Sequence, residues 1–265
     1  MADDRAREGR VALVTGGTEG IGRAIATALL DDGAHVAVTG RRAEKGARML
    51  AALDVGDRLH FIESDALADG EPGRVARLVA DRLGPIEILV NNVGGGTGEY
   101  GRIDTISPDS YRRGFELNVM TSVEATHAVL PQMIERGWGR ILMVASLEGK
   151  LPTLPGVGPY VTAKHALIGL AKSIAFDVGE FGITCNTLCP GYVDIPTRVR
   201  SQSASAGRAN SGRYADPQTN YKLLTRTGRH ATLDEVAHGA MSLLAESAGA
   251  ITGTTLNVDG GSSPF

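Results

Sequence analysis

Short runs of apolar, mostly β-branched residues alternate along the chain with longer amphipathic stretches of helical length. The runs are Val11–Thr15, Val36–Thr39, Leu59–Ile62, Ile88–Asn91, Ile141–Ala145, Ile183–Leu188 and Thr254–Val258. Near-continuous apolar strands separated by helices are typical of a parallel sheet covered on both faces. Seven strands in this rhythm predict a Rossmann-like, doubly wound α/β fold. We find no internal repeat and no domain break, so we expect one domain over residues 1–265.

Local signals mark where several helices begin and end. Ser107, Pro108 and Asp109 provide an N-cap, a proline at the first helical position and an early acid, and Gly137 closes that long helix. Thr232 and Glu235 have the spacing of a capping box. The stretch Ser201–Asn220 is poor in large apolar residues and breaks the rhythm. We interpret approximately 192–226 as a substrate lid rather than a passive loop, because long loops in compact domains are often functional.

Composition narrows the class of protein further. The 265 residues carry a net charge of -3, with no basic tract, which argues against a nucleic-acid or anionic-membrane partner. The start of the chain has no apolar segment of a signal peptide, and no apolar run is long enough to cross a bilayer, so we expect a cytoplasmic protein. We expect Cys185 and Cys189 to be buried and reduced. The histidines show no metal-ligand spacing, and we expect no metal.

The first strand leads into a glycine-rich turn that precedes a helix. Gly16 permits the tight turn, Gly20 lets the backbone approach a pyrophosphate, and Gly22 lets the helix pack closely on the strand. The helix N-terminus offers N–H groups and a positive dipole end to phosphates. Between a first strand and a first helix, this pattern indicates a dinucleotide-binding site rather than an empty structural turn.

The residues after the second strand indicate which dinucleotide binds. An NAD site has an acid here for the ribose 2′-hydroxyl, whereas this chain has Gly40 and then Arg41. Glycine leaves room for a 2′-phosphate, and a guanidinium can pair with it, which predicts NADP(H). Glu19 would repel that phosphate, and Arg42 can offset it; either arginine could instead be an ordinary surface charge.

Further polar groups follow strands at the same edge of the predicted sheet. They are Asn91–Gly94 after the fourth strand, Ser146 after the fifth, and Tyr160 and Lys164, which lie four residues apart on the next helix. The ordinary pKa of a phenol is near 10, and a nearby ammonium lowers it. Tyr160 is therefore the predicted proton donor, and Ser146 the group that aligns a carbonyl.

These motifs resemble the single-domain branch of the short-chain dehydrogenase/reductase family over essentially the whole chain. The resemblance implies that Asn118, Ser146, Tyr160 and Lys164 are catalytic, with Asn118 holding a water that links Lys164 to solvent. The family's coenzyme contacts fall on Gly16, Thr18, Glu19, Gly20, Ile21, Gly22, Arg41, Arg42, Asp65, Ala66, Asn91, Asn92, Val93, Gly94, Tyr160, Lys164, Pro190, Gly191, Val193 and Ile195. A homotetramer is implied by the same resemblance.

One position departs from the family's pattern. Where the family often has a threonine that contacts the coenzyme, this chain has Ile195, which either leaves that role to Thr197 or shapes the substrate pocket. Leu147, Glu148 and Tyr192 are the expected pocket residues, with Glu148 either a substrate contact or solvated.

The implied reaction is reversible hydride transfer between NADP(H) and a carbonyl, on a small-molecule ketone or alcohol, and we expect a polycyclic one. The stretches Ala145–Lys150, Ala163–His165 and Gly182–Gly191 look similar to ketoreductases of aromatic polyketide biosynthesis, which implies a tailoring step of angucycline type in antibiotic biosynthesis. Reduction of 3-oxoacyl groups on an acyl-carrier protein, and oxidation of a hydroxy acid or alcohol, remain alternatives. A different class, an NADPH-binding sensor or scaffold, does not require all four catalytic residues.

Overall fold

The computed structural model describes residues 7–195 and 225–263, so most of the expected lid lies outside the described residues. One sheet holds all the strands of these two segments, in the order β3-β2-β1-β4-β5-β6-β7, and every pairing is parallel. The strands are β1 (Val11–Val14), β2 (His35–Gly40), β3 (Leu59–Glu63), β4 (Ile88–Asn91), β5 (Gly139–Val144), β6 (Ile183–Pro190) and β7 (Thr255–Val258). The predicted seven-stranded, doubly wound architecture is confirmed.

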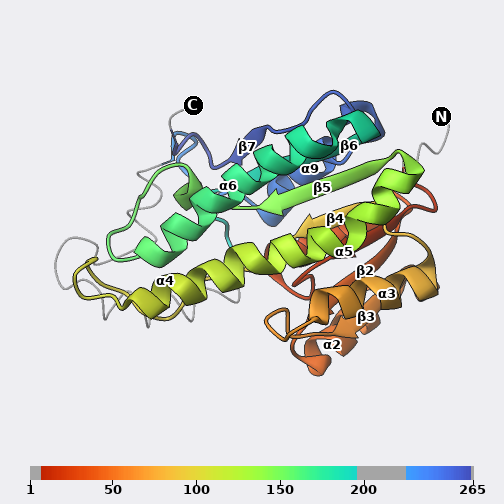
Figure 1. The fold of residues 1–265 in the computed structure, drawn as a ribbon, viewed down its shortest axis with the longest axis horizontal. Coiled ribbons are helices and arrows are strands. Elements are labelled where there is room, and N and C mark those ends of the chain that lie inside the picture. The colour runs from red at the N-terminus through yellow and green to blue at the C-terminus, as the bar shows by residue number, and fades with distance from the viewer. Residues whose placement is uncertain (1–6, 196–224, 264–265) are drawn as a thin grey trace.

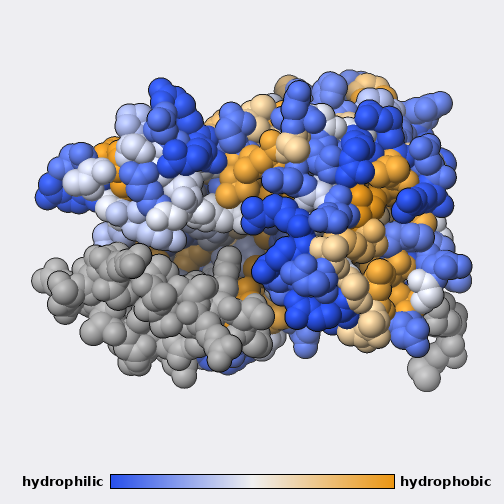
Figure 2. Space-filling view, turned by 90° about the horizontal axis from the view of Figure 1, so that it is seen from below, coloured by the Kyte–Doolittle hydropathy of each residue, from blue (hydrophilic) through white to orange (hydrophobic). Residues whose placement is uncertain are grey.

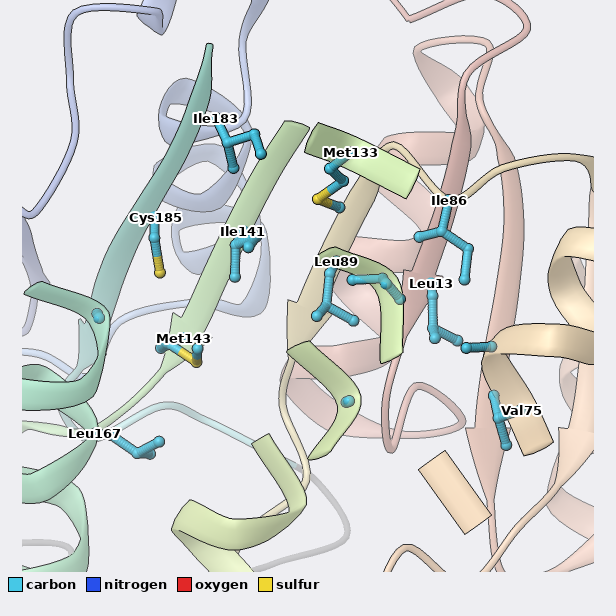
Figure 3. Packing of buried hydrophobic residues seen from close by; sticks show 14 of the residues in the cluster. Leu13, Val75, Ile86, Leu89, Met133, Ile141, Met143, Leu167, Ile183 and Cys185 are labelled. Carbon is cyan, nitrogen blue, oxygen red and sulfur yellow. The ribbon is translucent and has the colours of Figure 1, made fainter. Parts of the chain in front are cut away.

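Helices cover both faces of the sheet (Figure 1). They are α1 (Gly20–Asp31), α2 (Ala43–Leu53), α3 (Glu71–Leu83), α4 (Pro108–Phe115), α5 (Thr121–Arg136), α6 (Gly158–Val178) and α9 (Leu233–Leu243). Residues of α3, α5 and α6 pack on one face, where Val75, Met133 and Leu167 belong to one core cluster with Leu89 and Ile141 of the strands (Figure 3). Residues of α1, α2 and α9 form a separate core on the other face. The central strands β1, β4, β5 and β6 are buried at every position, which is why their sequences are rich in apolar residues.

The helix boundaries follow the local signals. Ser107 caps α4 by accepting a hydrogen bond from the Ser110 backbone at 3.3 Å, and the capping box of Thr232 and Glu235 is formed at the start of α9. Gly137 ends α5 with a φ of 66°. In place of the single long helix that we expected, the chain forms two helices, because a π-helical turn at Glu116–Met120 separates α4 from α5. Such turns are frequent at functional sites.

The chain reverses its direction of winding between β1 and β4. The first three strands add outward on one side of β1, and β4 returns to its other side, with Leu13 beside Leu89. Ligands of open α/β sheets bind at the carboxyl ends of the strands at such a switch point. The glycine-rich turn after β1 and the segment Asn92–Gly94 after β4 therefore lie together at the expected binding edge.

The outer surface is of mixed character. On the face drawn in Figure 2, hydrophobic patches are interrupted by hydrophilic residues. Among the described residues, no helix is long and apolar enough to cross a membrane. Both cysteines are buried and unpaired, as expected.

Candidate active site

The glycine-rich turn is fixed by the end of the neighbouring strand β2. Gly16 N donates a hydrogen bond to the Thr39 hydroxyl at 3.1 Å, and Gly17 N donates to the Thr39 carbonyl at 3.0 Å. Gly16 and Gly20 have φ values of 63° and 56°, a region in which side chains are strained. Glu19 precedes α1 without a capping side-chain bond, so the first turn of α1 presents backbone N–H groups to a ligand.

Asn92 ties the glycine-rich turn to the end of β4. Its side-chain nitrogen donates to the carbonyls of Thr15 and Gly16, both at 3.0 Å. A Cβ on Gly22 would lie 2.4 Å from this nitrogen, so the missing side chain of Gly22 leaves room for the Asn92 amide. This contact joins residues that are more than 70 positions apart, and sequence reasoning missed it.

A small hollow lies beside the ends of β1 and β2. Thr15, Thr39, Ala66 and Val93 are among the residues that line it. Asp65 is exposed and accepts a hydrogen bond from Leu67 N at 3.2 Å. Asn91, which we expect beside the ribose, is buried, and its side chain donates to the Thr126 hydroxyl at 3.1 Å.

Charged residues surround the end of β2. Glu19 pairs with Lys45 of α2, and its carboxylate lies 3.8 Å from the Arg42 guanidinium. Lys45 was not among the predicted residues, although its place in the first turns of α2 could have indicated it. Arg41 is exposed. Thr18 fills the space beside Gly40. A Cβ on Gly40 would lie only 2.9 Å from the Thr18 methyl carbon.

Lys164 and Tyr160 lie together on the first turns of α6. The Lys164 side chain is 3% exposed, and its Nζ donates a hydrogen bond to the Val144 carbonyl at 2.9 Å. The same Nζ lies 5.6 Å from the centre of the Tyr160 ring. A buried ammonium beside a half-buried phenol is the predicted pairing for proton donation.

Asn118 lies in the π-helical turn and faces Lys164 across Gly94. Its side chain is fully buried, accepts from Gly95 N at 2.9 Å, and donates to the carbonyls of Gly95 and Gly114. A Cβ on Gly94 would lie 2.5 Å from Asn118 Oδ1 and 3.0 Å from Lys164 Nζ. Gly94 is therefore the point at which these two side chains approach each other.

Ser146 follows β5 and lies next to α6. Its hydroxyl oxygen accepts a hydrogen bond from Glu148 N at 3.2 Å, and the hydroxyl can still donate its own proton to a ligand. Gly149 packs on the backbone of Lys164, where a Cβ would lie 2.8 Å from the Lys164 carbonyl oxygen. The Ser146 turn is thereby held against the helix that carries Tyr160.

The expected pocket residues extend this wall. Leu147 and Glu148 are both buried, and the Glu148 carboxylate accepts from the backbone and hydroxyl of Thr153. Burial raises the pKa of Glu148, and hydrogen bonds from Thr153 oppose that rise. Glu148 is thus held by protein donors and is not solvated. Thr153 was missed by sequence reasoning.

The segment after β6 lies on the opposite side. Gly191 N donates to the Val258 carbonyl at 3.0 Å, and Val193 pairs with Ala231. Ile195 is 7% exposed, and its Cδ1 would lie 3.6 Å from a Cβ on Gly20. Ile195 therefore covers the glycine-rich turn at the coenzyme side, and Thr197 lies outside the described residues.

Together these features suit a nicotinamide dinucleotide. The open N-terminus of α1 and the close approach permitted at Gly20 suit a pyrophosphate. Tyr160 and Lys164 lie on α6, and the turn that begins at Ser146 packs against Lys164 through Gly149. The fold and this site define a coenzyme-dependent oxidoreductase.

Comparisons with known proteins agree. Residues 10–206 match the family described as short chain dehydrogenase, and the chain belongs to this family. It is therefore an oxidoreductase that acts on hydroxyl and keto groups. It is 35% identical over 259 residues to D-beta-hydroxybutyrate dehydrogenase of Rhizobium meliloti (strain 1021), covering 95% of this chain and 98% of that one.

Two ketoreductases are similar to the chain as well. A putative ketoacyl reductase of Streptomyces coelicolor is 32% identical over 260 residues, covering 96% of this chain and 97% of that one. A crystal structure of a variant of actinorhodin polyketide ketoreductase with NADPH superposes with a TM-score of 0.88 at 30% identity, covering 98% of this chain and 99% of the other.

Proposed function

We propose that the protein is an NADP(H)-dependent ketoreductase in which Tyr160 protonates the carbonyl oxygen. The observation that carries the proposal is the packing of Asn118 and the Ser146 turn against Lys164, whose Nζ lies 5.6 Å from the centre of the Tyr160 ring. When bound, NADPH supplies the hydride to the carbonyl carbon.

The chain's own residues stabilise and neutralise the negative charge that develops on the carbonyl oxygen. Ser146 donates a hydrogen bond to this oxygen and orients it. Tyr160 transfers its phenolic proton to the same oxygen, and the Lys164 ammonium stabilises the phenolate that remains. The hydrogen bond from Lys164 Nζ to the Val144 carbonyl holds the ammonium in place. Asn118 lies on the other side of Gly94 from this ammonium.

Replacement of Tyr160 by Phe tests the mechanism. We expect turnover to fall by about two to four orders of magnitude, as for loss of a general acid. Affinity for NADPH, measured by fluorescence titration, should stay within about twofold, because the ring is retained. A Tyr160→Phe enzyme that reduces ketones at the parent rate would refute this function.

A preference for NADP(H) over NAD(H) is part of the proposal. Arg41 is exposed at the end of β2, and the negative charge of Glu19 is offset by Lys45 and Arg42. A guanidinium is suited to a 2′-phosphate. We expect Arg41→Ala to weaken NADPH binding by about tenfold and to leave NADH binding unchanged, because one charged hydrogen bond is lost. Tighter binding of NADH than NADPH by the parent would contradict this preference.

For the substrate we propose a polycyclic ketone of aromatic polyketide type, as in a tailoring step of antibiotic biosynthesis. Its support is the similarity to actinorhodin polyketide ketoreductase along nearly the full length of both chains. A second candidate, a short hydroxy acid, is favoured by the 35% identity to D-beta-hydroxybutyrate dehydrogenase. Rates with 1-tetralone and with acetoacetate separate the two: we expect faster reduction of the bicyclic ketone, and faster reduction of acetoacetate would favour the hydroxy acid.

We further propose a cytoplasmic homotetramer with a substrate lid at approximately 192–226. Phe176 of α6 and Phe115 of α4 are 92% and 41% exposed, on helices that we expect at the subunit interface. Light scattering should give four times the chain mass for the parent and a smaller assembly for Phe176→Glu. A monomeric parent would refute the tetramer.

A further inference from the structure

A series of hydrogen bonds connects the two sides of the candidate substrate pocket. On one side, Glu148 follows Ser146 and is only 7% exposed. Its two carboxylate oxygens accept from Thr153 N at 3.2 and 3.1 Å, and one of them accepts from the Thr153 hydroxyl. The Thr153 hydroxyl oxygen lies 2.7 Å from the phenolic oxygen of Tyr192, which follows β6.

The donors and acceptors in this series take one direction when Glu148 is ionised. An ionised carboxylate can only accept, so the hydroxyl of Thr153 uses its single proton towards Glu148. The Thr153 oxygen therefore accepts from the phenol of Tyr192. The orientation of Tyr192 thus depends on Glu148 through one intervening hydroxyl group.

Both ends of the series are anchored in the rigid part of the fold. Glu148 N donates to the Ser146 hydroxyl oxygen at 3.2 Å, so the same residue contacts the catalytic serine. At the other end, the Tyr192 carbonyl accepts from Ala231 N at 3.0 Å. The loop after β5 and the loop after β6 are therefore held at a set separation beside the reacting centre.

The burial of Glu148 is not explained by packing. Burying a carboxyl group is unfavourable, and an apolar side chain of similar volume would fill the same place without that cost. The chain nevertheless places a carboxyl at this point and surrounds it with donors. A group that is costly in stability and connected to the catalytic serine points to a role in the site.

We propose that Glu148, Thr153 and Tyr192 form a bridge that sets the width of the substrate pocket. In this bridge Glu148 and Thr153 are positioning residues, and Tyr192 is the wall that they hold. The bridge determines which ketones reach Ser146 and Tyr160, and so governs substrate discrimination rather than coenzyme binding. This inference rests on the proposed function, because it places the ketone in that pocket.

The test is a double-mutant cycle across the bond between Thr153 and Tyr192. Thr153→Val keeps the volume and removes the hydroxyl, and Tyr192→Phe removes the phenolic oxygen. For the parent, both single variants and the double variant, kcat and KM are measured with NADPH for a narrow ketone, cyclohexanone, and a wide one, 1-decalone. NADPH affinity and the unfolding midpoint are measured for each protein.

We expect Tyr192→Phe to change the ratio of the two kcat/KM values by about fivefold, mainly through KM of the wide ketone, as for loss of one hydrogen bond, and Thr153→Val to change it at least as much. The double variant should equal Thr153→Val rather than the product of both changes, because Thr153→Val already removes the bond that Tyr192→Phe removes, together with the bond to Glu148. Thr153→Ser retains the hydroxyl and should restore the parent ratio.

Two results would overturn the bridge: effects that multiply in the double variant, and a Thr153→Ser protein that behaves like Thr153→Val. If Thr153→Val fails to fold, Tyr192→Phe compared with the parent still decides, since an unchanged ratio there refutes the bridge. If the parent reduces neither ketone, the proposed function as a reductase is refuted rather than the bridge. The same ratios are then measured for oxidation of cyclohexanol and 1-decalol, so the two failures remain distinguishable.

Discussion

A methyl group added at Gly94 tests the point at which the Asn118 and Lys164 side chains approach each other. In Gly94→Ala the new Cβ would lie 2.5 Å from Asn118 Oδ1 and 3.0 Å from Lys164 Nζ. Neither neighbour can yield easily. Asn118 is fully buried and makes two hydrogen bonds with Gly95, and Lys164 is held by the Val144 carbonyl.

The size of the effect follows from these contacts. Moving Asn118 disrupts its two bonds with Gly95, which contribute about 1 kcal/mol each. Overpacking adds at least about 1 kcal/mol. We therefore expect Gly94→Ala to lower the free energy of unfolding by about 3 kcal/mol, or about 6 to 12 °C in Tm for a chain of this size. Turnover should fall by at least about tenfold, because Lys164 is displaced from its position beside Tyr160.

Gly95→Ala is the matched control. A Cβ on Gly95 would meet nothing within 4 Å, so this neighbouring substitution should leave stability within about 1 kcal/mol of the parent. Urea unfolding gives the stabilities, and NADPH oxidation with a ketone gives the rates. Equal losses in the two variants, or parent-like stability and turnover in Gly94→Ala, would refute the described packing of Asn118 and Lys164.

Three further expectations follow from the structure. Gly22→Ala should lower both stability and NADPH affinity in thermal-shift titrations, because its Cβ would lie 2.4 Å from the Asn92 side-chain nitrogen; unchanged NADPH affinity would contradict this geometry. Hydrogen bonding to Arg229 lowers the pKa of Glu235 to about 2, so the ionised form stabilises the fold above its unfolded pKa and this contribution is lost as pH falls from about 4.5 towards about 2. The difference in Tm between the parent and Glu235→Gln should therefore shrink over that range, and a constant difference would count against the ion pair. Neither cysteine thiol should react quickly with a disulfide reagent at pH 8 in the folded protein, since both are buried and burial raises the pKa of Cys189 to about 11; a thiol titrated within seconds before unfolding would show that the core opens.

Much of the fold was available from local patterns. The apolar runs correspond to the seven strands, because a parallel strand covered on both faces is rich in apolar residues. The caps at Ser107 and Thr232 begin α4 and α9 because their side chains satisfy N–H groups within a few residues. Tyr160 and Lys164 share one face of α6 through helical spacing alone.

Other parts of the site depend on contacts between distant segments. Asn92 was predicted at the coenzyme, yet its bonds to Thr15 and Gly16 exist only because β4 lies beside β1 in the sheet. Lys45 meets Glu19 because the ends of two parallel βα units lie at the same edge. No local signal carries such pairings.

The sequence by itself determined the strand rhythm, the helix caps and the shared face of Tyr160 and Lys164, because each depends on neighbouring residues or on simple periodicity. The tertiary structure alone decided how those groups are held. The π-helical turn that positions Asn118 beside Gly94, and the bonds that join Glu148 to Tyr192 through Thr153, arise where separate loops are brought into contact at the carboxyl edge of the sheet. Their geometry is set by the packing of whole elements, which residue spacing along the chain does not encode.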